Sequence, residues 1–377
     1  MGVSLGCANR VVAKTRFASK APYAILVDAD TGAVLYAQKP DELMAPASMS
    51  KLMTVAIIFR ELKAGRLTLE NTFKVSVNAW RNGGAPSGTS AMFAPLNTEI
   101  TLADLIPGII VQSGNDACII VAEGLAGNEE AFAKMMVEEA RRIGLSKSTF
   151  GNSTGLPNPK QLMTVRELAL LASYLIKEYP EYYHYFSTKE FRYRMHRFIN
   201  RNPLVFKYGA DGLKTGSTKE SGYGLVVSAV KGGRRLVSVV NGLESKRDRR
   251  VEAERLLDWG FSGFKEYRLF EPGSVVGHAR VLGGSASYVP LVGEQKNGVH
   301  ALLPLYLAEK KVPARIVYEG PLKPPVKKGD QVAYLQVTAE GTVENKIPLF
   351  AAEDVSRSGL FWRGIDTLLY RAFGWLF

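Results

Sequence analysis

The stretch APASMSKLMT, residues 45–54, determines how the chain is organised. Its first residues are typical of the end of an extended segment, and the apolar residues after them recur at helical spacing. The pattern predicts a largely buried helix that continues to about Gly65, with Ser48 in its first turn. Lys51 follows three residues later, so its side chain lies on the same face of the helix as Ser48.

The pairing of Ser48 and Lys51 is chemically suggestive. A serine hydroxyl becomes a good nucleophile when a neighbouring base takes its proton. An amine in a protein interior can lose its charge and act as that base. The helix N-terminus adds free N–H groups where an oxyanion would form. The alternative is that Ser48 caps the helix and Lys51 is solvated, because Ser-x-x-Lys often occurs by chance.

Composition and charge narrow the class of protein. The chain has 377 residues, of which 46% are hydrophobic and 22% charged, so it is globular and long enough for two domains. A net charge of +12 favours an anionic partner, such as nucleic acid, acidic lipid or an anionic polymer. No block of Lys and Arg interleaved with aromatic residues stands out, so we expect no nucleic-acid partner.

The cysteines and histidines argue against several kinds of site. The two cysteines, Cys7 and Cys118, do not suggest a disulfide framework. None of the four histidines lies near a Gly-x-Ser-x-Gly or a His-Glu-x-x-His pattern. We therefore expect neither a histidine-based triad nor a metal, and no cofactor.

A second polar element is SGN, residues 113–115, between two apolar helical runs. A helix–helix turn needs such residues for its own geometry. The functional alternative is that Ser113 and Asn115 project into a cleft beside Ser48. Ser113 could then relay a proton to a leaving amine, and Asn115 could hold Lys51 or a substrate amide.

A third element is KTG, residues 214–216, on or just before a strand that precedes a strong hairpin pattern at residues 222–243. Gly216 removes a side chain where another backbone could approach closely. Lys214 and Thr215 offer a cation and a hydroxyl to a carboxylate. The alternative is an exposed strand with a glycine bulge. Farther along, we expect a helix over Val251–Trp259 that is preceded by solvated arginines.

The rest of the chain suggests further segments. Residues 1–20 are basic but lack the apolar core of a signal peptide, so we expect a leader or an incomplete export-signal remnant. Residues 21–265 contain the three polar elements, and residues 266–355 show the short β-runs of a separate all-β domain. Residues 356–377 are typical of an amphipathic helix in a membrane surface. A docked terminal helix or a dimer contact is the alternative.

Taken in order, the three elements resemble the signature of penicillin-binding proteins and class A β-lactamases. The runs at residues 46–54, 112–117 and 211–216 are similar to those of D-alanyl-D-alanine carboxypeptidases of the penicillin-binding protein 5 type. The similarity covers most of residues 22–350. It implies an α/β (α+β) domain of the β-lactamase/transpeptidase type, with an antiparallel sheet flanked by helices. A small all-β domain and a C-terminal amphipathic helix follow it.

The resemblance also implies catalytic roles. Ser48 attacks the carbonyl between two D-alanines of a peptidoglycan stem pentapeptide, and Lys51 is the base. Ser113 passes the proton to the departing D-alanine, while Asn115 positions Lys51 and the substrate. The backbone N–H groups of Ser48 and Ser217 form the oxyanion hole. Ser217 stands where relatives often carry His.

Substrate binding follows from the same resemblance. Lys214, Thr215 and Gly216 line the strand that binds the terminal carboxylate, and Arg249 assists. β-Lactams are expected to acylate Ser48. The expected location is the periplasmic face of a bacterial inner membrane, with peripheral attachment.

Three alternatives remain open. A D,D-endopeptidase uses the same chemistry. A β-lactamase-like hydrolase would need a carboxylate that activates the water for deacylation. It is disfavoured because the class A form of that element, a Glu-x-x-Leu-Asn run, is absent between Ser113 and Lys214. A non-catalytic wall-binding protein would tolerate the loss of Ser48 or Lys51, and both are present.

Overall fold

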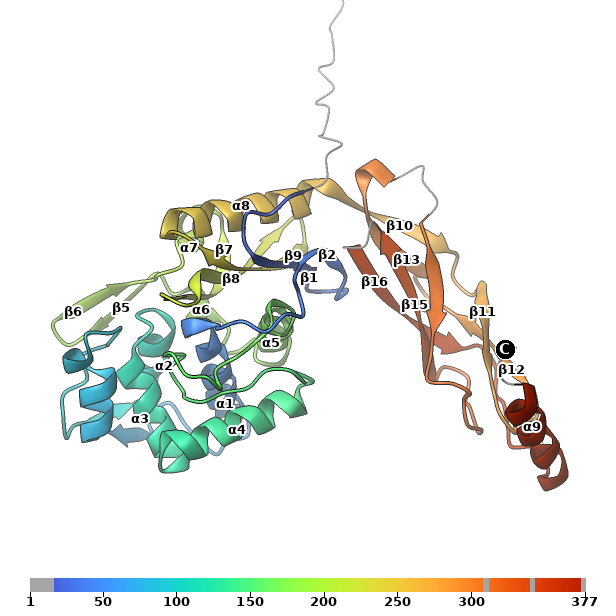
Figure 1. Cartoon of the computed structure of the whole chain (residues 1–377), viewed down its shortest axis with the longest axis horizontal. Coiled ribbons are helices and arrows are strands. Elements are labelled where there is room, and N and C mark those ends of the chain that lie inside the picture. Colours follow the sequence, from blue (N-terminus) through green and yellow to red (C-terminus); the bar gives the residue numbers. More distant parts are fainter. Residues whose placement is uncertain (1–16, 308–311, 340–342, 374–377) are drawn as a thin grey trace, which may run out of the picture. The chain divides into compact units, whose positions relative to one another are not determined.

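The computed structural model describes residues 17–307, 312–339 and 343–373, drawn in colour in Figure 1. Most of the predicted leader therefore lies outside the described residues. The chain forms two compact units. Over the described residues, the larger unit comprises residues 17–30 and Tyr36–Ser262, and the smaller unit comprises residues 31–35 and 263–373.

An antiparallel sheet forms the centre of the larger unit. Its strands run in the order β1, β9, β8, β7. Their bounds are Tyr23–Asp28 for β1, Arg234–Leu243 for β9, Gly222–Lys231 for β8 and Ala210–Thr218 for β7. Strands β8 and β9 form the predicted hairpin, and its two-residue turn is made by Gly232 and Gly233, both with positive φ. Glycine adopts this conformation without the strain that a side chain would add.

Helices cover both faces of this sheet (Figure 1). Helix α8, Lys246–Gly263, packs on β1 and β9, where a Cβ at Gly260 would lie 2.5 Å from Leu26. Helix α5, Val165–Glu178, contacts β1, β8 and β9 from the other side. The remaining helices are α1 Lys51–Lys63, α2 Leu102–Ile110, α3 Asn115–Ala126, α4 Glu129–Arg142, α6 His184–Ser187 and α7 Leu204–Lys207, with short turns η1 Ala47–Ser50, η2 Ala79–Gly83 and η3 Ala85–Ser87. Two small hairpin sheets pair β3 Thr72–Lys74 with β4 Glu99–Thr101, and β5 Glu190–Tyr193 with β6 His196–Ile199.

The predicted start of the helix over Val251–Trp259 was wrong. Helix α8 begins at Lys246 rather than at Val251, so Arg249 lies inside it. The physical reason is a cap, because the Ser245 hydroxyl accepts a hydrogen bond from Asp248 N at 3.0 Å. Apolar spacing could not locate this start, because the first residues of the helix, 246–250, are all charged.

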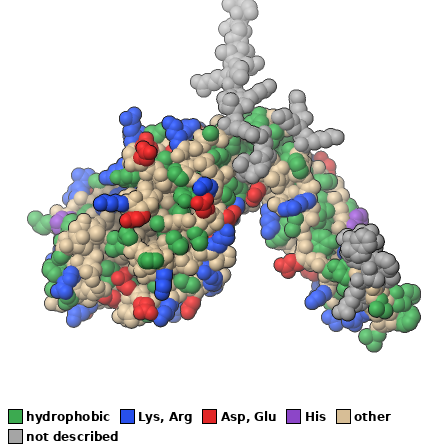
Figure 2. Space-filling view, in the orientation of Figure 1, with side chains coloured by type: hydrophobic (Ala, Val, Ile, Leu, Met, Phe, Trp, Pro, Cys, Tyr) green, Lys and Arg blue, Asp and Glu red, His purple; other side chains and the backbone are tan. Residues whose placement is uncertain are grey.

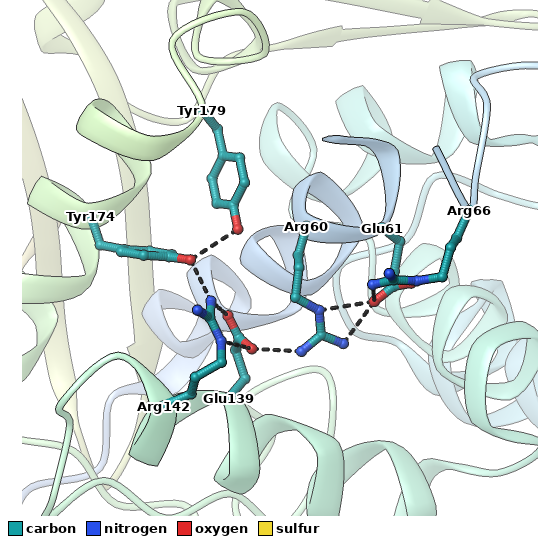
Figure 3. A network of polar contacts seen from close by, with 7 residues as sticks. All are labelled: Arg60, Glu61, Arg66, Glu139, Arg142, Tyr174 and Tyr179. Atoms are coloured by element: carbon teal, nitrogen blue, oxygen red, sulfur yellow. Dashed lines mark hydrogen bonds and ion pairs between the residues drawn. The ribbon is translucent and has the colours of Figure 1, made fainter. Parts of the chain in front are cut away.

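A buried carboxylate ties α1 to α4 (Figure 3). Glu139 is 1% exposed and accepts hydrogen bonds from Arg60 at 2.5 Å and Arg142 at 2.9 Å. Burial acts to raise the pKa of Glu139, but the hydrogen bonds from the two arginines outweigh it and lower the pKa below its usual value. Tyr174 of α5 accepts a hydrogen bond from Arg142, which extends the network to a third helix.

The smaller unit is built from β-strands. They are β10 Phe264–Phe270, β11 Val275–Arg280, β12 Tyr288–Val292, β13 Val299–Pro304, β14 Ala314–Val317, β15 Gln331–Ala339 and β16 Val343–Ala351, joined by part of β2, Val34–Gln38. Along β15 the buried residues alternate with more exposed ones, as expected for a strand with one face on a core. The prediction of an all-β region after the segment with the three polar elements is confirmed.

The chain continues into helix α9, Leu360–Phe373, within the smaller unit. Asp366 attaches the helix, because its carboxylate accepts a hydrogen bond from Gly283 N at 2.6 Å and pairs with Arg280. Phe361 and Trp362 are 74% and 66% exposed. Figure 2 shows hydrophobic side chains grouped at this end of the unit. No helix of the described residues is long and apolar enough to cross a bilayer.

Candidate active site

Ser48 lies in the tight turn η1, immediately before α1. The preceding residue, Ala47, has a positive φ of 46°, an uncommon conformation for a residue with a side chain. Such backbone strain is concentrated at functional sites. Ser48 is half-buried, whereas Lys51 at the start of α1 is fully buried. The predicted helix is present, but the expected extended end before it was wrong, because Ala47 starts a tight turn that holds Ser48 just ahead of α1.

The Lys51 amine has three oxygen partners. Lys51 Nζ lies 2.9 Å from Ser48 Oγ and 2.7 Å from Asn115 Oδ1, and it also donates to the carbonyl oxygen of Thr154. Amide and carbonyl oxygens only accept hydrogen bonds. They therefore take the two N–H groups of a neutral amine and leave its lone pair for the hydroxyl of Ser48. This is the geometry of a general base.

Burial changes the proton affinity of this amine. Removal from water is the largest cause that lowers the pKa of Lys51 to about 8. A substantial fraction of the amine is therefore neutral near physiological pH. A base works best when its pKa lies near the working pH, so the site favours proton removal from Ser48.

The SGN element forms the turn between α2 and α3. Ser113 is 2% exposed and has a positive φ of 64°. Asn115 N donates to Ser90 O at 2.7 Å, and Asn115 Nδ2 donates to Thr89 Oγ1 at 2.8 Å. Because the amide nitrogen is occupied by Thr89, the amide oxygen faces Lys51. The element therefore forms a turn, and its Asn115 also contacts Lys51, as one of the two alternatives for this residue expected.

The KTG element lies on β7, an edge strand of the sheet in the larger unit. A Cβ at Gly216 would lie 2.8 Å from Pro46 O and 3.1 Å from Met49 N. The close backbone approach predicted from Gly216 is thus present, and it brings β7 against the Ser48 turn. Lys214 is 2% exposed, and burial lowers its pKa well below the usual value.

These elements surround a cleft of about 390 Å³. Its walls are made by residues that share small, hydroxylated or cationic side chains: Ser48, Ser90, Ser113, Arg201, Thr215, Gly216, Ser217, Lys246 and Arg249. Arg249 is 6% exposed, and burial lowers its pKa to about 10, so the guanidinium stays charged at neutral pH. Among the described residues, no three His, Cys, Asp or Glu side chains are grouped as metal ligands.

Sequence reasoning missed Arg201. This arginine lines the cleft, and its Nη1 donates to Ser90 Oγ at 2.7 Å. The loop that carries it is fixed by its neighbours. Asn202 Nδ2 donates to Gly212 O, and Asn200 Nδ2 donates to Thr188 O, both at 2.8 Å. The two asparagines that flank Arg201 were the available signal, because such side chains often stabilise irregular backbone.

A turn that pairs Ser48 with Lys51, the polar turn between α2 and α3, and strand β7 beside them are the arrangement of an active-serine enzyme with the transpeptidase-like fold. The chain belongs to the D-alanyl-D-alanine carboxypeptidase family, whose model matches residues 9–245. A second model, penicillin-binding protein 5, C-terminal domain, matches residues 264–357. The resemblance inferred from the motifs is confirmed, and so is the fold class.

Individual relatives agree with this assignment. D-alanyl-D-alanine carboxypeptidase DacC of Escherichia coli (strain K12) is 36% identical over 93% of this chain and 88% of its own length. Penicillin binding protein 5 from Haemophilus influenzae has a crystal structure with a TM-score of 0.73 and 32% identity, covering 91% of this chain and 99% of that one. Penicillin-Binding Protein D2 from Listeria monocytogenes, in its ampicillin-bound form, is 28% identical with a TM-score of 0.57, over 66% of this chain and all (100%) of that one.

Proposed function

We propose that this chain is a serine-type D-alanyl-D-alanine carboxypeptidase that removes the terminal D-alanine from peptidoglycan stem pentapeptides. The observation that carries the proposal is the environment of the Lys51 amine. Its Nζ atom lies 2.9 Å from Ser48 Oγ and donates hydrogen bonds to Asn115 Oδ1 and to the carbonyl oxygen of Thr154. Family membership supplies the substrate class, since the relatives named above include a D-alanyl-D-alanine carboxypeptidase.

Acylation begins when Lys51 takes the hydroxyl proton of Ser48. The oxygen of Ser48 then bonds to the carbonyl carbon of the penultimate D-alanine, and charge develops on the carbonyl oxygen. The backbone N–H groups of Ser48 and Ser217 stabilise that oxyanion. The proton passes through Ser113 to the nitrogen of the last D-alanine as the carbon–nitrogen bond breaks. Asn115 keeps the amine of Lys51 aligned.

Deacylation completes the cycle. Water attacks the ester carbon on Ser48, the ester bond breaks, and a proton returns to the serine oxygen. The products are free D-alanine and a tetrapeptide. β-Lactams acylate Ser48 by the same first step, which agrees with the ampicillin-bound form of one relative.

The terminal carboxylate of the substrate is bound on the β7 side of the cleft. Thr215 offers a hydroxyl and Arg249 supplies positive charge, while the buried amine of Lys214 lies next to Thr215 on the same strand. Gly216 keeps the strand close enough to the Ser48 turn for one substrate to reach both. Carboxylate binding places the scissile bond beside the nucleophile, which is the positioning that such reactions require.

We further propose the division of the chain and its location. Residues 1–20 are a leader or export remnant, 21–265 the peptidase domain, 266–355 the β-rich domain and 356–377 the membrane-attaching helix. The exposed Phe361 and Trp362, with Asp366 turned to the β-strands, support attachment at a membrane surface. The location is the periplasmic face of the inner membrane.

A direct test measures D-alanine release from a diacylated Lys-D-Ala-D-Ala peptide. The chain is expected to release D-alanine, and Ser48→Ala to release none. Unchanged release by Ser48→Ala would end the assignment. A D,D-endopeptidase remains the second candidate, because a D-alanyl-D-alanine endopeptidase of E. coli is 29% identical over 67% of this chain. Faster cleavage of cross-linked dimers than of pentapeptides would favour it.

A further inference from the structure

The active-site cleft carries more positive charge than one terminal carboxylate requires. Arg201, Lys246 and Arg249 all line it, and no acidic side chain does. Throughout the described parts of the chain, these three cations form no ion pair with a carboxylate. Arg201 donates to the hydroxyl of Ser90, and Arg249 lies 5.8 Å from the ring centroid of Tyr223. The cleft therefore holds charge that lacks a counterion.

One of these cations has an unused donor in the interior. The Nε atom of Arg249 is buried without a hydrogen-bond partner, and the residue is 6% exposed. A buried donor without a partner is costly, so its persistence at a cleft suggests that a ligand completes it. Under the proposed function, Arg249 and Thr215 take the terminal carboxylate.

Lys246 extends the same face of α8. It lies three residues before Arg249, so the two side chains are neighbours one helical turn apart. Lys246 is exposed and stands in the first turn of an 18-residue helix, where the backbone N–H groups also favour an anion. Two acids are near in sequence: Glu244, which precedes the helix, and Asp248, whose carboxylate is engaged by Ser245. Neither lines the cleft.

We propose that the cleft prefers a leaving residue with a second carboxylate on its side chain, and that Lys246 is the residue that recognises it. The substrate class is a peptide that ends in D-Ala followed by an acidic D-amino acid, such as D-glutamate. This inference rests on the proposed function. The chemistry is unchanged: the amide bond before the leaving residue is hydrolysed, and the free amino acid departs.

The position of Lys246 follows from that of Arg249. Arg249 binds the α-carboxylate of the leaving residue, so a cation one turn before it in α8 lies next to that residue rather than next to the acyl part. A side-chain carboxylate reaches Lys246 without moving the scissile bond away from Ser48. Arg201 is a poorer candidate because Ser90 already orients its guanidinium.

The test compares two isosteric substrates, diacetyl-Lys-D-Ala-D-Glu and diacetyl-Lys-D-Ala-D-Gln, with release of the last residue measured by mass spectrometry. The full chain is expected to show a kcat/KM for D-Glu about 5-fold above that for D-Gln, as suits one exposed charge pair. Lys246→Met is expected to bring the ratio to about 1, Lys246→Glu to reverse it, and Lys246→Arg to retain it. Both kcat/KM values are measured on the same enzyme sample, so their ratio does not depend on the fraction of a variant that is folded.

Lys231→Met is the matched control. Lys231 is an exposed lysine at the end of β8, outside the cleft. Its substitution removes the same charge and should leave the D-Glu to D-Gln ratio unchanged. A ratio of about 1 in the unmodified chain would overturn the inference, as would an unchanged ratio in both Lys246→Met and Lys246→Glu. Failure to release D-alanine from the reference peptide would instead overturn the proposed carboxypeptidase, and this inference with it.

Discussion

Lys51 Nζ lies 2.9 Å from Ser48 Oγ, across one turn at the start of a buried helix. Three separate parts of the chain contact this pair or its turn. The Ser48 turn packs against Gly216 of β7. Lys51 contacts Asn115 from the α2–α3 turn and the carbonyl group of Thr154 from a loop. The proposed base, Lys51, is oriented by groups that take no part in the proposed reaction, as is usual around an activated nucleophile.

The first prediction concerns pH. Only neutral Lys51 can take the proton of Ser48, and burial lowers its pKa to about 8. The rate of acylation by a penicillin should therefore rise with pH below that value, about tenfold per unit, and level off above it. Stopped-flow measurement of acylation between pH 6 and 9.5 checks this. A rate independent of pH over the range would contradict the role of Lys51 as base.

The second prediction concerns Asn115. Asn115→Asp places a negative charge beside the Lys51 amine, which favours the ammonium form and raises the pKa of Lys51. The acylation profile should move to higher pH, with a roughly 100-fold lower rate at pH 7. Asn115→Ala removes the oriented acceptor without adding charge, so it should slow acylation with no upward shift. Identical profiles for the two variants would show that the amide oxygen does not act on Lys51.

The third prediction concerns stability. Glu139 is buried between Arg60 and Arg142, so Glu139→Gln should lower the free energy of unfolding by about 1–3 kcal/mol. Both arginines are partly exposed, which limits the loss. Because the pKa of Glu139 is lowered on folding, its contribution is present above the unfolded pKa and disappears as pH falls through the folded value. Urea titrations at pH 7 and pH 3.5 should show the difference between variant and parent at pH 7 and a smaller one at pH 3.5.

The fourth prediction concerns α9. Deleting residues 356–377 should release the chain from vesicles that contain anionic lipid and leave D-alanine release intact. Replacing Phe361 and Trp362 by Ser should weaken binding in the same flotation assay, because these exposed side chains supply apolar area to the interface. Met195→Ser, an exposed apolar residue of the larger unit, is the control and should bind as the parent does. Flotation of the truncated chain would refute the anchor.

Local sequence patterns predicted much of the fold and part of the site. Apolar periodicity gave helix α1, and the Gly232–Gly233 pair gave the hairpin, because both depend on neighbouring residues alone. The absence of a side chain at Gly216 indicated a close backbone approach before its partner was known.

Other parts of the site carry no local signal. The acceptor at Thr154 is a backbone carbonyl, which every residue possesses. Arg201 reaches the cleft because asparagine side chains fix its loop to distant backbone. Lys246 was not predicted as a site residue because it belongs to a basic run that apolar spacing did not assign to the helix. The same run prevented recognition of Ser245 as the helix cap. In each case tertiary contacts, rather than spacing along the chain, decide the position.

The central claim is that Ser48 is the nucleophile, and covalent labelling tests it most directly. The chain is incubated with benzylpenicillin, its intact mass is measured, and the modified residue is located by peptide mapping. We predict a single penicilloyl adduct on the peptide that contains Ser48, and none on Ser48→Ala. An adduct on another residue would contradict the account. So would a chain that releases D-alanine but acquires no adduct from benzylpenicillin.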